Sequence, residues 1–514
     1  MEGPMQAPLP QTHAAQDDNL TLGLDPDTQV NMQQYKEQVP RWKRIHQHSL
    51  TQMLFISVQA FCGPALMDAI GGLGRGGLAT PKTSNIRFAL MNGTEAIFCA
   101  FGGVLINILG AKWCLVLGAA TFPLFGASYY CNSQFNNQWF LIASGPFNGA
   151  GIAFWNIAEG TYVMSIAPQQ KRGKYLALWI ISQNGGQLVG GAINLAKNAA
   201  SAGGGGVSPS TYLPFIALQA IALPFALGIC EMHNVVRSDG TKILILPKLS
   251  HKAETKRILK TFTSKVILCM TMFIIWSYFY NGPWSTYLSL YFSVRSRALS
   301  SLISPFFCIV GCFGLGIVTD SKGVSQRRRA QYGFWLVIIS NVFVYIWSLI
   351  MEVRYTRNDP GAIDWSDKRF AESFLPYFFI QTTGPLAQVH CYWLLSSFAE
   401  SAQDNARNGS ALKCIQAIGN CIAYGVSSTG ATPLVGMILN CALMLAAIPG
   451  MWWITGHTPD RIPADVIAEE MTAEEAKVAA AADESDKKNI TTNVATREVS
   501  CRPSPNDNEG SYVI

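Results

Sequence analysis

The chain alternates between long apolar stretches and short polar segments. Windows of about 20 residues, the length that crosses the hydrocarbon core of a bilayer, identify twelve apolar stretches. In chain order they are 50–70, 87–109, 111–130, 138–166, 175–196, 211–231, 265–292, 299–318, 332–351, 372–397, 409–428 and 433–455. Six lie before and six lie after a basic segment, so we expect an all-α polytopic membrane protein with twelve transmembrane helices.

The polar segments divide the chain into five parts. Residues 1–48, 232–265 and 455–514 carry 38 of the 70 Asp, Glu, Lys and Arg residues. We therefore expect a disordered N-terminal tail, a six-helix bundle, a basic linker, a second six-helix bundle and a mostly disordered C-terminal tail. These parts are 1–48, 49–231, 232–264, 265–455 and 456–514.

Composition narrows the class of protein. Of the 514 residues, 49% are hydrophobic and 14% are charged, which is too apolar for an ordinary soluble enzyme. The formal net charge is +6, and the basic residues lie in short loops rather than on one basic domain. Nucleic-acid binding is therefore not expected.

Lys and Arg residues in the connecting segments predict the orientation in the membrane. With the N-terminus inside, the cytoplasmic segments hold 21 basic residues and the opposite segments hold 10, among them Arg75, Arg87 and Arg297. Basic loops stay preferentially in the cytoplasm, so both termini are expected there.

No pattern in the chain indicates catalysis, a cofactor or a metal. Nearly all of the thirteen cysteines lie inside apolar stretches, and Cys308 and Cys312 share a helix face without a His or acidic neighbour. The glycines at 71–77 and 203–206 precede no Gly-Lys-Ser/Thr sequence, so we expect flexible outer loops instead of a phosphate loop. We expect no enzyme activity, no cofactor and no ATP-driven transport.

A short pattern occurs twice, at the end of the second helix of each bundle. Gly103, Asn107 and Gly110 follow G-x-x-x-[N/D]-x-x-G, and the same pattern returns 213 residues later. The full sets are Gly103, Asn107, Gly110 and Lys112, and Gly316, Asp320, Gly323 and Arg327. Glycine permits close helix packing in a membrane, and a short polar side chain can cap a helix. We interpret the two sets as a cytoplasmic gate between two pseudo-symmetric halves.

The duplicated pattern, the six-plus-six arrangement and the basic central segment resemble the major facilitator superfamily. Three further stretches resemble its Unc-ninety-three-like branch, especially the fungal members: Gly71–Gly77, Trp155–Pro168 with Lys171, Arg172 and Gly173, and Tyr291–Ser300. The resemblance implies the major facilitator fold and a transporter. It fixes no substrate, because the branch includes proteins described as channel regulators or trafficking partners. Asn107 departs from the acid usual in the superfamily's loop motif, and Asp320 keeps it.

Two carboxylates inside the expected spans are candidates for proton coupling. Glu95 lies near the centre of the second span with Asn92 three residues before it, and Glu159 has the same relation to Asn156. Each carboxyl either loads and releases a proton or is a structural acid bonded to a neighbouring helix. For Glu159 the structural reading is pairing with Lys171, Arg172 or Lys174 at the end of its helix. Asp68 is interpreted as an interfacial residue or a loop cap.

A substrate site is expected near the midplane, between the two halves. The polar and aromatic candidates are Asn92, Trp155, Asn156, Gln183, Asn184, Tyr278, Tyr280, Gln388 and Asn420. Each alone is more often a helix-packing contact than a ligand contact. The set is mostly neutral and aromatic, which favours a small amphipathic or uncharged organic molecule over a polyanion.

The sequence therefore predicts a proton-coupled secondary transporter of a small organic molecule that works by alternating access. The expected partners are the lipid bilayer, the substrate and protons. The alternative is a membrane regulator without transport activity that binds a channel or receptor. The plasma membrane is the default location, with an endomembrane as the other choice.

Overall fold

The computed structural model describes residues 35, 37–78, 81–167, 172–237, 251–319, 321, 323–398 and 402–459. Within these residues the regular structure consists of α-helices and short 3₁₀ helices, with no strand. The first half contains α3 (Ser49–Cys62), α4 (Pro64–Gly71), α5 (Pro81–Ala100), α6 (Gly102–Phe135), α7 (Gln138–Ile166), α8 (Arg172–Asn198) and α9 (Tyr212–Leu227). The second half contains α11 (Lys265–Phe279), α12 (Asn281–Tyr291), α13 (Val294–Thr319), α14 (Gln326–Arg357), α15 (Phe370–Ser397), α16 (Ala402–Ser428) and α17 (Pro433–Gly456).

Short helices flank these halves. They are α2 (Arg41–Gln47), α10 (His251–Phe262) and the 3₁₀ helices η2 (Arg75–Gly77), η4 (Pro209–Thr211) and η5 (Met232–Asn234). Thus the described end of the N-terminal tail and the described part of the basic linker are helical. The remainder of both expected tails, 1–34 and 460–514, lies outside the described residues.

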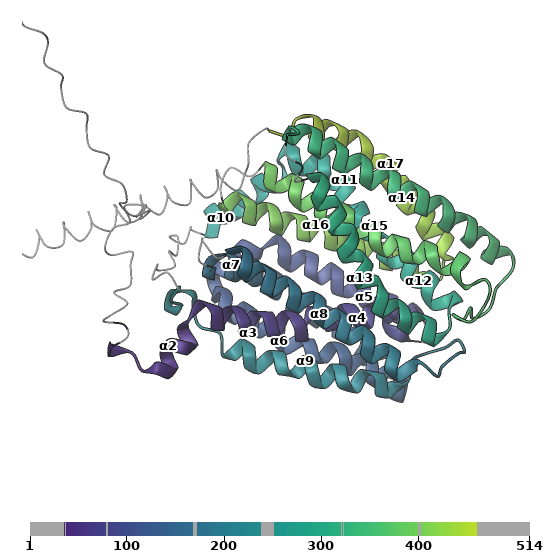
Figure 1. The fold of residues 1–514 in the computed structure, drawn as a ribbon, viewed down its shortest axis with the longest axis horizontal. Helices are drawn as coiled ribbons and strands as arrows, with labels where there is room; N and C mark the ends of the chain where they lie inside the picture. Colours follow the sequence, from purple (N-terminus) through teal and green to yellow (C-terminus); the bar gives the residue numbers. More distant parts are fainter. Residues whose placement is uncertain are drawn as a thin grey trace, which may run out of the picture.

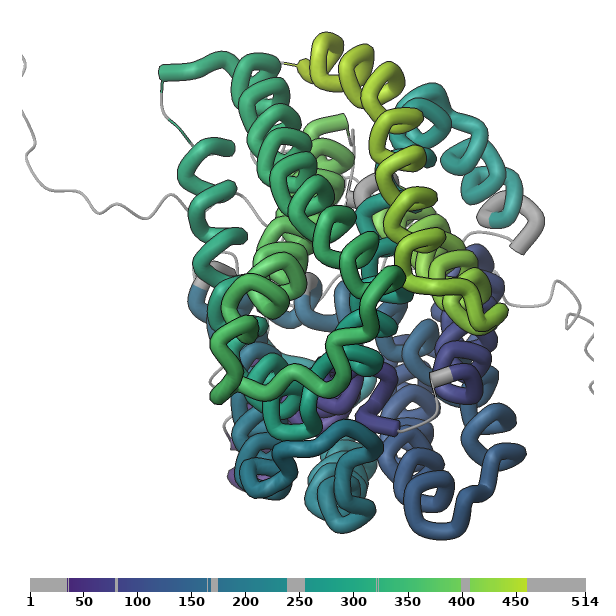
Figure 2. Tube along the Cα trace, turned by 90° about the vertical axis from the view of Figure 1, so that its right-hand side faces the viewer, coloured from purple at the N-terminus to yellow at the C-terminus, as the bar shows by residue number. Residues whose placement is uncertain are grey.

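The two halves lie side by side, with their long helices running in roughly one direction (Figures 1 and 2). Most of each apolar stretch predicted from the sequence is helical, but 87–109 crosses the turn at Phe101 between α5 and α6, and 211–231 extends beyond the end of α9. Among the described residues, seven helices are long and apolar enough to cross a membrane. The helices α5, α8 and α16 are not among these seven, and each carries polar side chains that bond to another helix. The structure therefore has the all-α polytopic architecture that the sequence predicts.

The contacts between the halves are reciprocal. The second helix of the first half, α5, packs against the fifth helix of the second half, α16. Likewise α8, the fifth helix of the first half, packs against α13, the second helix of the second half. A pseudo-two-fold axis between two equivalent halves produces this arrangement, as the repeated sequence pattern predicts.

The first helix of each half is broken. Gly63 has non-helical angles (φ −98°, ψ −99°), and Pro64 begins α4 at a position where its missing N–H costs nothing. A Cβ on Gly63 would overlap the ring of Phe122, so glycine also permits the close approach of α6. In the second half the helix is interrupted at Tyr280, between α11 and α12, although the angles of this residue (φ −58°, ψ −26°) stay right-handed helical. Broken helices leave backbone and polar groups available in the interior.

The glycine-rich segment at 71–77 is packed and mostly buried, contrary to the expected flexible loop, whereas the glycines at 203–206 are exposed. We call the end of the molecule formed by residues 71–78 and 199–208 the glycine-rich end. Gly76 has φ +64°, and a Cβ there would overlap the ring of Tyr129. Val207 donates its N–H to the carbonyl of Gly77 at 2.8 Å, which joins the two segments. Glycine is needed here because it alone combines this backbone conformation with this close packing.

Three arginines that the sequence assigns to loops are buried at or near this end. Arg75, Arg87 and Arg297 are 3%, 0% and 0% exposed. Arg75 bonds Thr286 across the two halves, and Arg297 bonds the carbonyl of Gly205. Val294 and Arg295 also donate their N–H groups to the carbonyls of Gly203 and Ser201. The glycine-rich end therefore ties the two halves together.

The repeated pattern lies at the opposite end, which we call the tail end because it holds α2, α10 and the end of α17. Its last glycines, Gly110 and Gly323, have φ +79° and +85°, and a Cβ at either would meet nothing within 4 Å. Backbone conformation alone therefore favours glycine at both positions. Arg329 donates to the carbonyls of Thr319 at 3.1 Å and Val324 at 3.0 Å, so a cation lies at the C-terminus of α13.

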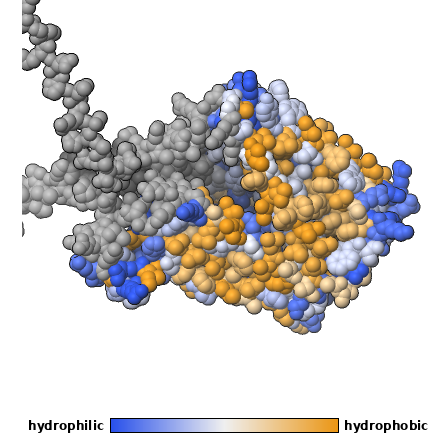
Figure 3. All heavy atoms as spheres, viewed as in Figure 1, coloured by the Kyte–Doolittle hydropathy of each residue, from blue (hydrophilic) through white to orange (hydrophobic). Residues whose placement is uncertain are grey.

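The surface agrees with a bilayer environment. On the face shown in Figure 3, hydrophobic side chains cover the middle of the molecule and hydrophilic ones gather toward both ends. Large apolar residues such as Phe313, Ile339 and Leu445 are 73%, 65% and 63% exposed. Such a broad apolar belt is stable against lipid tails rather than water.

Candidate functional site

Glu95 and Asn156 meet in the interior of the first half. The side-chain amide of Asn156 on α7 donates to Oε1 of Glu95 on α5 at 3.1 Å. The sequence placed Asn156 on the same helical face as Glu159 but did not reveal this contact between α5 and α7. Asn92 instead donates to the carbonyl of Phe88 on its own helix at 2.7 Å. Glu95 is half-buried, so one of its oxygens is held while the side chain stays accessible.

Lys413 on α16 faces this carboxylate from the second half. Its charge interacts electrostatically with Glu95, Glu159 and Asp68. Its ammonium nitrogen lies 5.9 Å from the centre of the Tyr392 ring. No described carboxylate lies within 4.0 Å of that nitrogen, so Lys413 has no contact ion pair there. A cation inside a membrane span is costly, which makes this position a candidate for function.

Asp68 also belongs to the interior cluster. It follows the break in the first helix, and its Oδ2 accepts a bond of 2.8 Å from Gln187 on α8. It interacts with Lys413 of the other half and yet is exposed, so its side chain faces an accessible space between the halves. The interpretation of Asp68 as a loop cap is therefore wrong.

Glu159 lies deeper in the first half than Glu95. It is 8% exposed, and its Oε1 has no hydrogen-bond partner among the described residues. Its described charged neighbour is Lys413, not Lys174, while the side chain of Arg172 and all of Lys171 lie outside the described residues. The indole nitrogen of Trp179 is near it but makes no hydrogen bond that meets geometric criteria.

The broken helix of the second half contributes polar groups to the same space. Asn281, at the start of α12, donates to Oδ1 of Asn420 at 3.0 Å. Gln388 donates to the carbonyl of Ser277 on α11 at 3.3 Å. Tyr278 is half-buried and interacts electrostatically with Lys413 and Glu95. The structure thus brings Asn156 and Tyr278 to the carboxylates and lysine, with Asn420 and Gln388 on neighbouring helices.

Other predicted cavity residues pack within one half. Trp155 is 1% exposed and packs against Phe122, while Tyr280 is 5% exposed and lies against Gly384. Asn184 bonds the carbonyl of Ile180 on its own helix, and Gln183 is half-buried. Their role in binding stays a prediction. Of the predicted gate residues, Gly103, Asn107, Gly110, Lys112, Gly316, Gly323 and Arg327 are described, and Asp320 lies outside the described residues.

Sequence reasoning missed Lys413 although its signal was present. Basic residues were counted in the connecting segments, whereas Lys413 falls inside the predicted span 409–428 and entered neither total. Glu352, which is 0% exposed and accepts a bond from Tyr291 at 3.2 Å, was missed for a different reason, because the predicted span 332–351 ends one residue before it. A search for charges inside spans, rather than for acids alone, finds Lys413.

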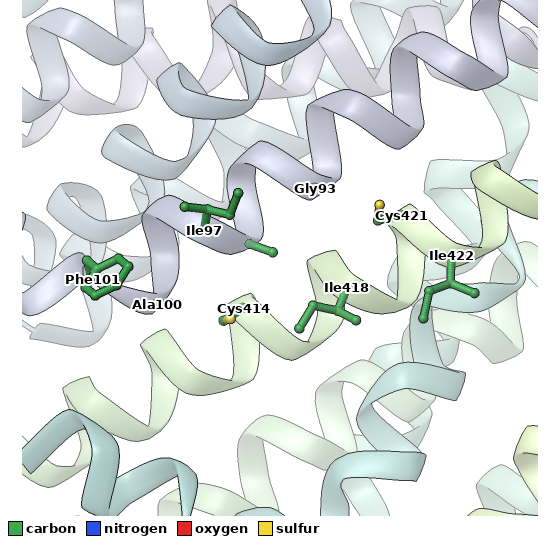
Figure 4. Close-up of a pocket in the computed structure, with 9 residues that line it drawn as sticks. Gly93, Ile97, Ala100, Phe101, Cys414, Ile418, Cys421 and Ile422 are labelled. Carbon is green, nitrogen blue, oxygen red and sulfur yellow. The ribbon is translucent and has the colours of Figure 1, made fainter.

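An apolar groove lies between the same two helices that carry Glu95 and Lys413. It has a volume of about 400 Å³ and is lined by residues of α5 and α16 and the turn at Phe101 (Figure 4). The lining residues are Gly93, Ala96, Ile97, Ala100, Phe101, Cys414, Ile418, Cys421 and Ile422. Ile97 and Ile422 are exposed and lie on nearly the opposite sides of their helices from Glu95 and Lys413, so the groove opens away from the charged cluster.

A metal centre finds no support in the described part of the chain. No group of three His, Cys, Asp or Glu side chains there is arranged to hold an ion. The cluster therefore offers carboxylates, amides, tyrosines and one ammonium group. Such a set can hold a small polar molecule and exchange a proton with it.

Comparisons with known proteins agree with this architecture. Residues 49–363 match the Major Facilitator Superfamily. The chain is 32% identical to notoamide biosynthesis cluster protein O' of Aspergillus versicolor, over 80% of this chain and 89% of the relative. It is 24% identical to UNC93-like protein 1 of Arabidopsis thaliana, over 78% and 88%. A solved D-xylose-proton symporter has the same fold, with a TM-score of 0.52, 17% identity and coverage of 79% of this chain and 98% of the symporter. This chain is therefore a member of the major facilitator superfamily, in its Unc-93-like branch.

Proposed function

We propose that the protein is a proton-coupled secondary transporter of a small organic molecule. The observation that carries the proposal is the cluster of charges between the halves, with Glu95 on α5 bonded to Asn156 on α7 and facing Lys413 on α16. Charges inside membrane spans without contact ion pairs are costly, so a purely structural role does not explain them. A transport cycle in which a carboxyl group of this cluster binds and releases a proton would explain why these charges are present.

Glu95 is the proposed coupling carboxylate. One oxygen accepts from Asn156, which fixes the carboxyl group while the second oxygen can take up a proton. Glu159 is a second candidate, because its Oε1 has no partner among the described residues. A carboxyl group that alternates between two solvent-accessible states can couple its protonation to the movement of the halves.

The halves would rock around this cluster. The reciprocal pairs α5 with α16 and α8 with α13 form the surfaces that slide, and the glycine-rich end holds the halves closed on one side. The repeated segments with Gly110 and Gly323 would form the gate at the tail end. The excess of Lys and Arg at that end favours a cytoplasmic orientation for it and for both termini.

The test compares the small-molecule content of cells and medium for cells that express the wild type, Glu95→Gln, Glu372→Gln or no protein. Glu372 is the matched control because it is an exposed acid on α15 that pairs with Arg354. We expect a compound whose distribution changes with the wild type and with Glu372→Gln but not with Glu95→Gln. Equal movement by Glu95→Gln would contradict the coupling role.

The alternative is a regulator that binds another membrane protein and transports nothing. Relatives named UNC93-like keep this reading open. If no compound moves at matched expression, and a membrane protein co-purifies stably with the chain, the regulator replaces the transporter as the leading function.

A further inference from the structure

We infer that Lys413 binds an acidic group of the substrate, so that the transported molecule is a small organic anion such as a carboxylate. This inference rests on the proposed transport function and names its substrate class. It narrows the expectation of a small amphipathic or uncharged molecule, which came from a residue set that omitted Lys413, to an amphipathic monoanion.

The first support is the state of the ammonium group. Lys413 lies in the middle of α16, and its described charged neighbours act at a distance greater than that of a contact ion pair. Glu95, an acid of the first half that interacts with Lys413, already uses its Oε1 to accept a hydrogen bond from Asn156. Tyr392 is its main described neighbour, and a neutral hydroxyl leaves donors of the ammonium group available to an anion, whose charge-assisted hydrogen bonds are the stronger ones.

The second support is the aromatic surface beside it. The Tyr392 ring lies 5.9 Å from the ammonium nitrogen and is 40% exposed, and Tyr278 is half-buried on the adjacent α11. Accessible rings beside a cation favour a ligand with a flat or apolar body and one acidic group. The apolar body would lie against the tyrosines, and the acid would reach Lys413.

The third support is the placement of the acids on the opposite half. Lys413 belongs to the second half, whereas Glu95 and Asp68 belong to the first. An anion that binds Lys413 removes part of the positive field that favours the ionised form of Glu95. The titratable groups facing Glu95 are Lys413, Asp68, Cys99, Cys414 and Tyr278, and Lys413 is the cation among them. Substrate binding would therefore favour proton uptake by Glu95, and one proton would move with each monoanion.

The experiment measures binding to the purified full chain in nanodiscs with three matched pairs of probes. These are acetate and acetamide, benzoate and benzamide, and indole-3-acetate and indole-3-acetamide, at a pH where the acids are ionised. We expect at least one acid to bind about tenfold more tightly than its amide, which corresponds to one favourable charged contact. Equal affinity within every pair, or no binding of any acid, would overturn the inference.

Variants assign the preference to Lys413. Lys413→Gln should remove the preference for the acid, and Lys413→Arg should retain most of it, which shows that the site is folded. Lys197→Gln, which changes an exposed lysine at the end of α8, should behave as the wild type. A preference that survives in Lys413→Gln would contradict the assignment.

A transport measurement separates this inference from the proposed function. In proteoliposomes with a pH gradient, uptake of the preferred acid should be electroneutral and should stop in Glu95→Gln while binding persists. Binding that depends on Lys413 without any uptake would reject the transporter and keep the anion site. Uptake of an amide that is independent of Lys413 would keep the transporter and reject the anion site.

Discussion

Buried charges are treated differently in two regions of this molecule. At the glycine-rich end, Arg87 and Arg297 are 0% exposed and bond neutral side chains or carbonyl groups. In the central cluster, Lys413 and Glu95 are half-buried, come from opposite halves and lack a contact ion pair among the described residues. Arg87 has its charge bonded within the protein, although Nε and Nη1 of Arg297 have no hydrogen-bond partner among the described residues. The central cluster leaves its charges without contact ion pairs.

Whether a charge has a bonding partner within the protein distinguishes structural from functional charges better than its position in the sequence does. A charge whose hydrogen bonds are met by the fold contributes to stability, and removing it leaves its partners unpaired. A charge without a contact partner costs stability, so its presence calls for a ligand, a proton or another conformation. Replacing a bonded charge such as Arg87 should therefore lower stability strongly, and replacing a charge without a contact partner such as Lys413 should change it little.

The largest effect is expected for Arg87→Ala. The guanidinium bonds Asn148 at 2.7 Å and Ser144 at 3.3 Å and lies 4.1 Å from the centre of the Phe125 ring. Its loss leaves a cavity and an unpaired amide oxygen, which should lower the free energy of unfolding by about 3 kcal/mol. Thermal unfolding in detergent checks this. Arg87→Lys should fall between the wild type and the alanine variant, and an unchanged Tm in Arg87→Ala would break the comparison.

The next effect is expected for Gly76→Ala. The new methyl group would meet the Tyr129 ring at a backbone conformation with φ +64°, so we expect a loss of about 2 kcal/mol in stability. Gly71→Ala is the matched control in the same segment, because a Cβ there meets nothing within 4 Å. If both variants unfold at the same temperature, the packing described for the glycine-rich end is wrong.

A pH-dependent effect is expected at the loop before α15. Arg295 holds the pKa of the Asp364 carboxyl well below its usual range, helped by Ser366 and Ser293. Because the folded pKa is depressed, this stabilisation is present above the unfolded pKa of about 3.9 and is lost as the pH falls toward the folded value. Asp364→Asn should therefore have a lower Tm than the wild type at pH 7.

The difference between Asp364→Asn and the wild type should narrow below about pH 4, where the unfolded chain takes up the proton. Unfolding curves collected between pH 7 and pH 3 give this comparison. A Tm difference that stays constant over this range would show that the ion pair contributes nothing.

The smallest effect on stability is expected for Lys413→Gln. The amide keeps most of the volume and removes a charge that has no contact anion, so the free energy of unfolding should change by less than about 1 kcal/mol. The measurement is again thermal unfolding, without added anions. A loss as large as that of Arg87→Ala would place Lys413 with the structural charges and remove the main argument for an anion site.

Much of the fold could be predicted from the sequence because the bilayer imposes one strong rule. Most of each of the twelve apolar stretches is helical, and the repeat at Gly103–Lys112 and Gly316–Arg327 indicated two equivalent halves before any contact was known. The length of an apolar stretch is a local property, so it can be read from about 20 consecutive residues. The breaks at Gly63 and Tyr280 are less visible, since they depend on a neighbouring helix as well as on local residues.

The candidate site was only partly predictable, because its pairings join different helices. Glu95 and Asn156 were both named, but spacing along one helix predicts only a shared face and not the contact between α5 and α7. The buried state of Arg75 depends on Thr286, which is 211 residues away. The order of the glycine-rich segment likewise depends on Tyr129 of α6. Contacts between residues that are far apart in the chain cannot be read from composition or from hydrophobic periodicity.

The two glycines at the tail end bear on how the protein arose. Gly110 and Gly323 occupy equivalent places in the two halves and share a positive φ, whereas the residue three positions earlier is Asn107 in one half and Asp320 in the other. If the halves descend from one duplicated ancestor, both have kept a glycine with positive φ at this turn, while the residue three positions before it now differs between an amide and an acid. The path of the chain was then under stricter selection at this loop than its charge.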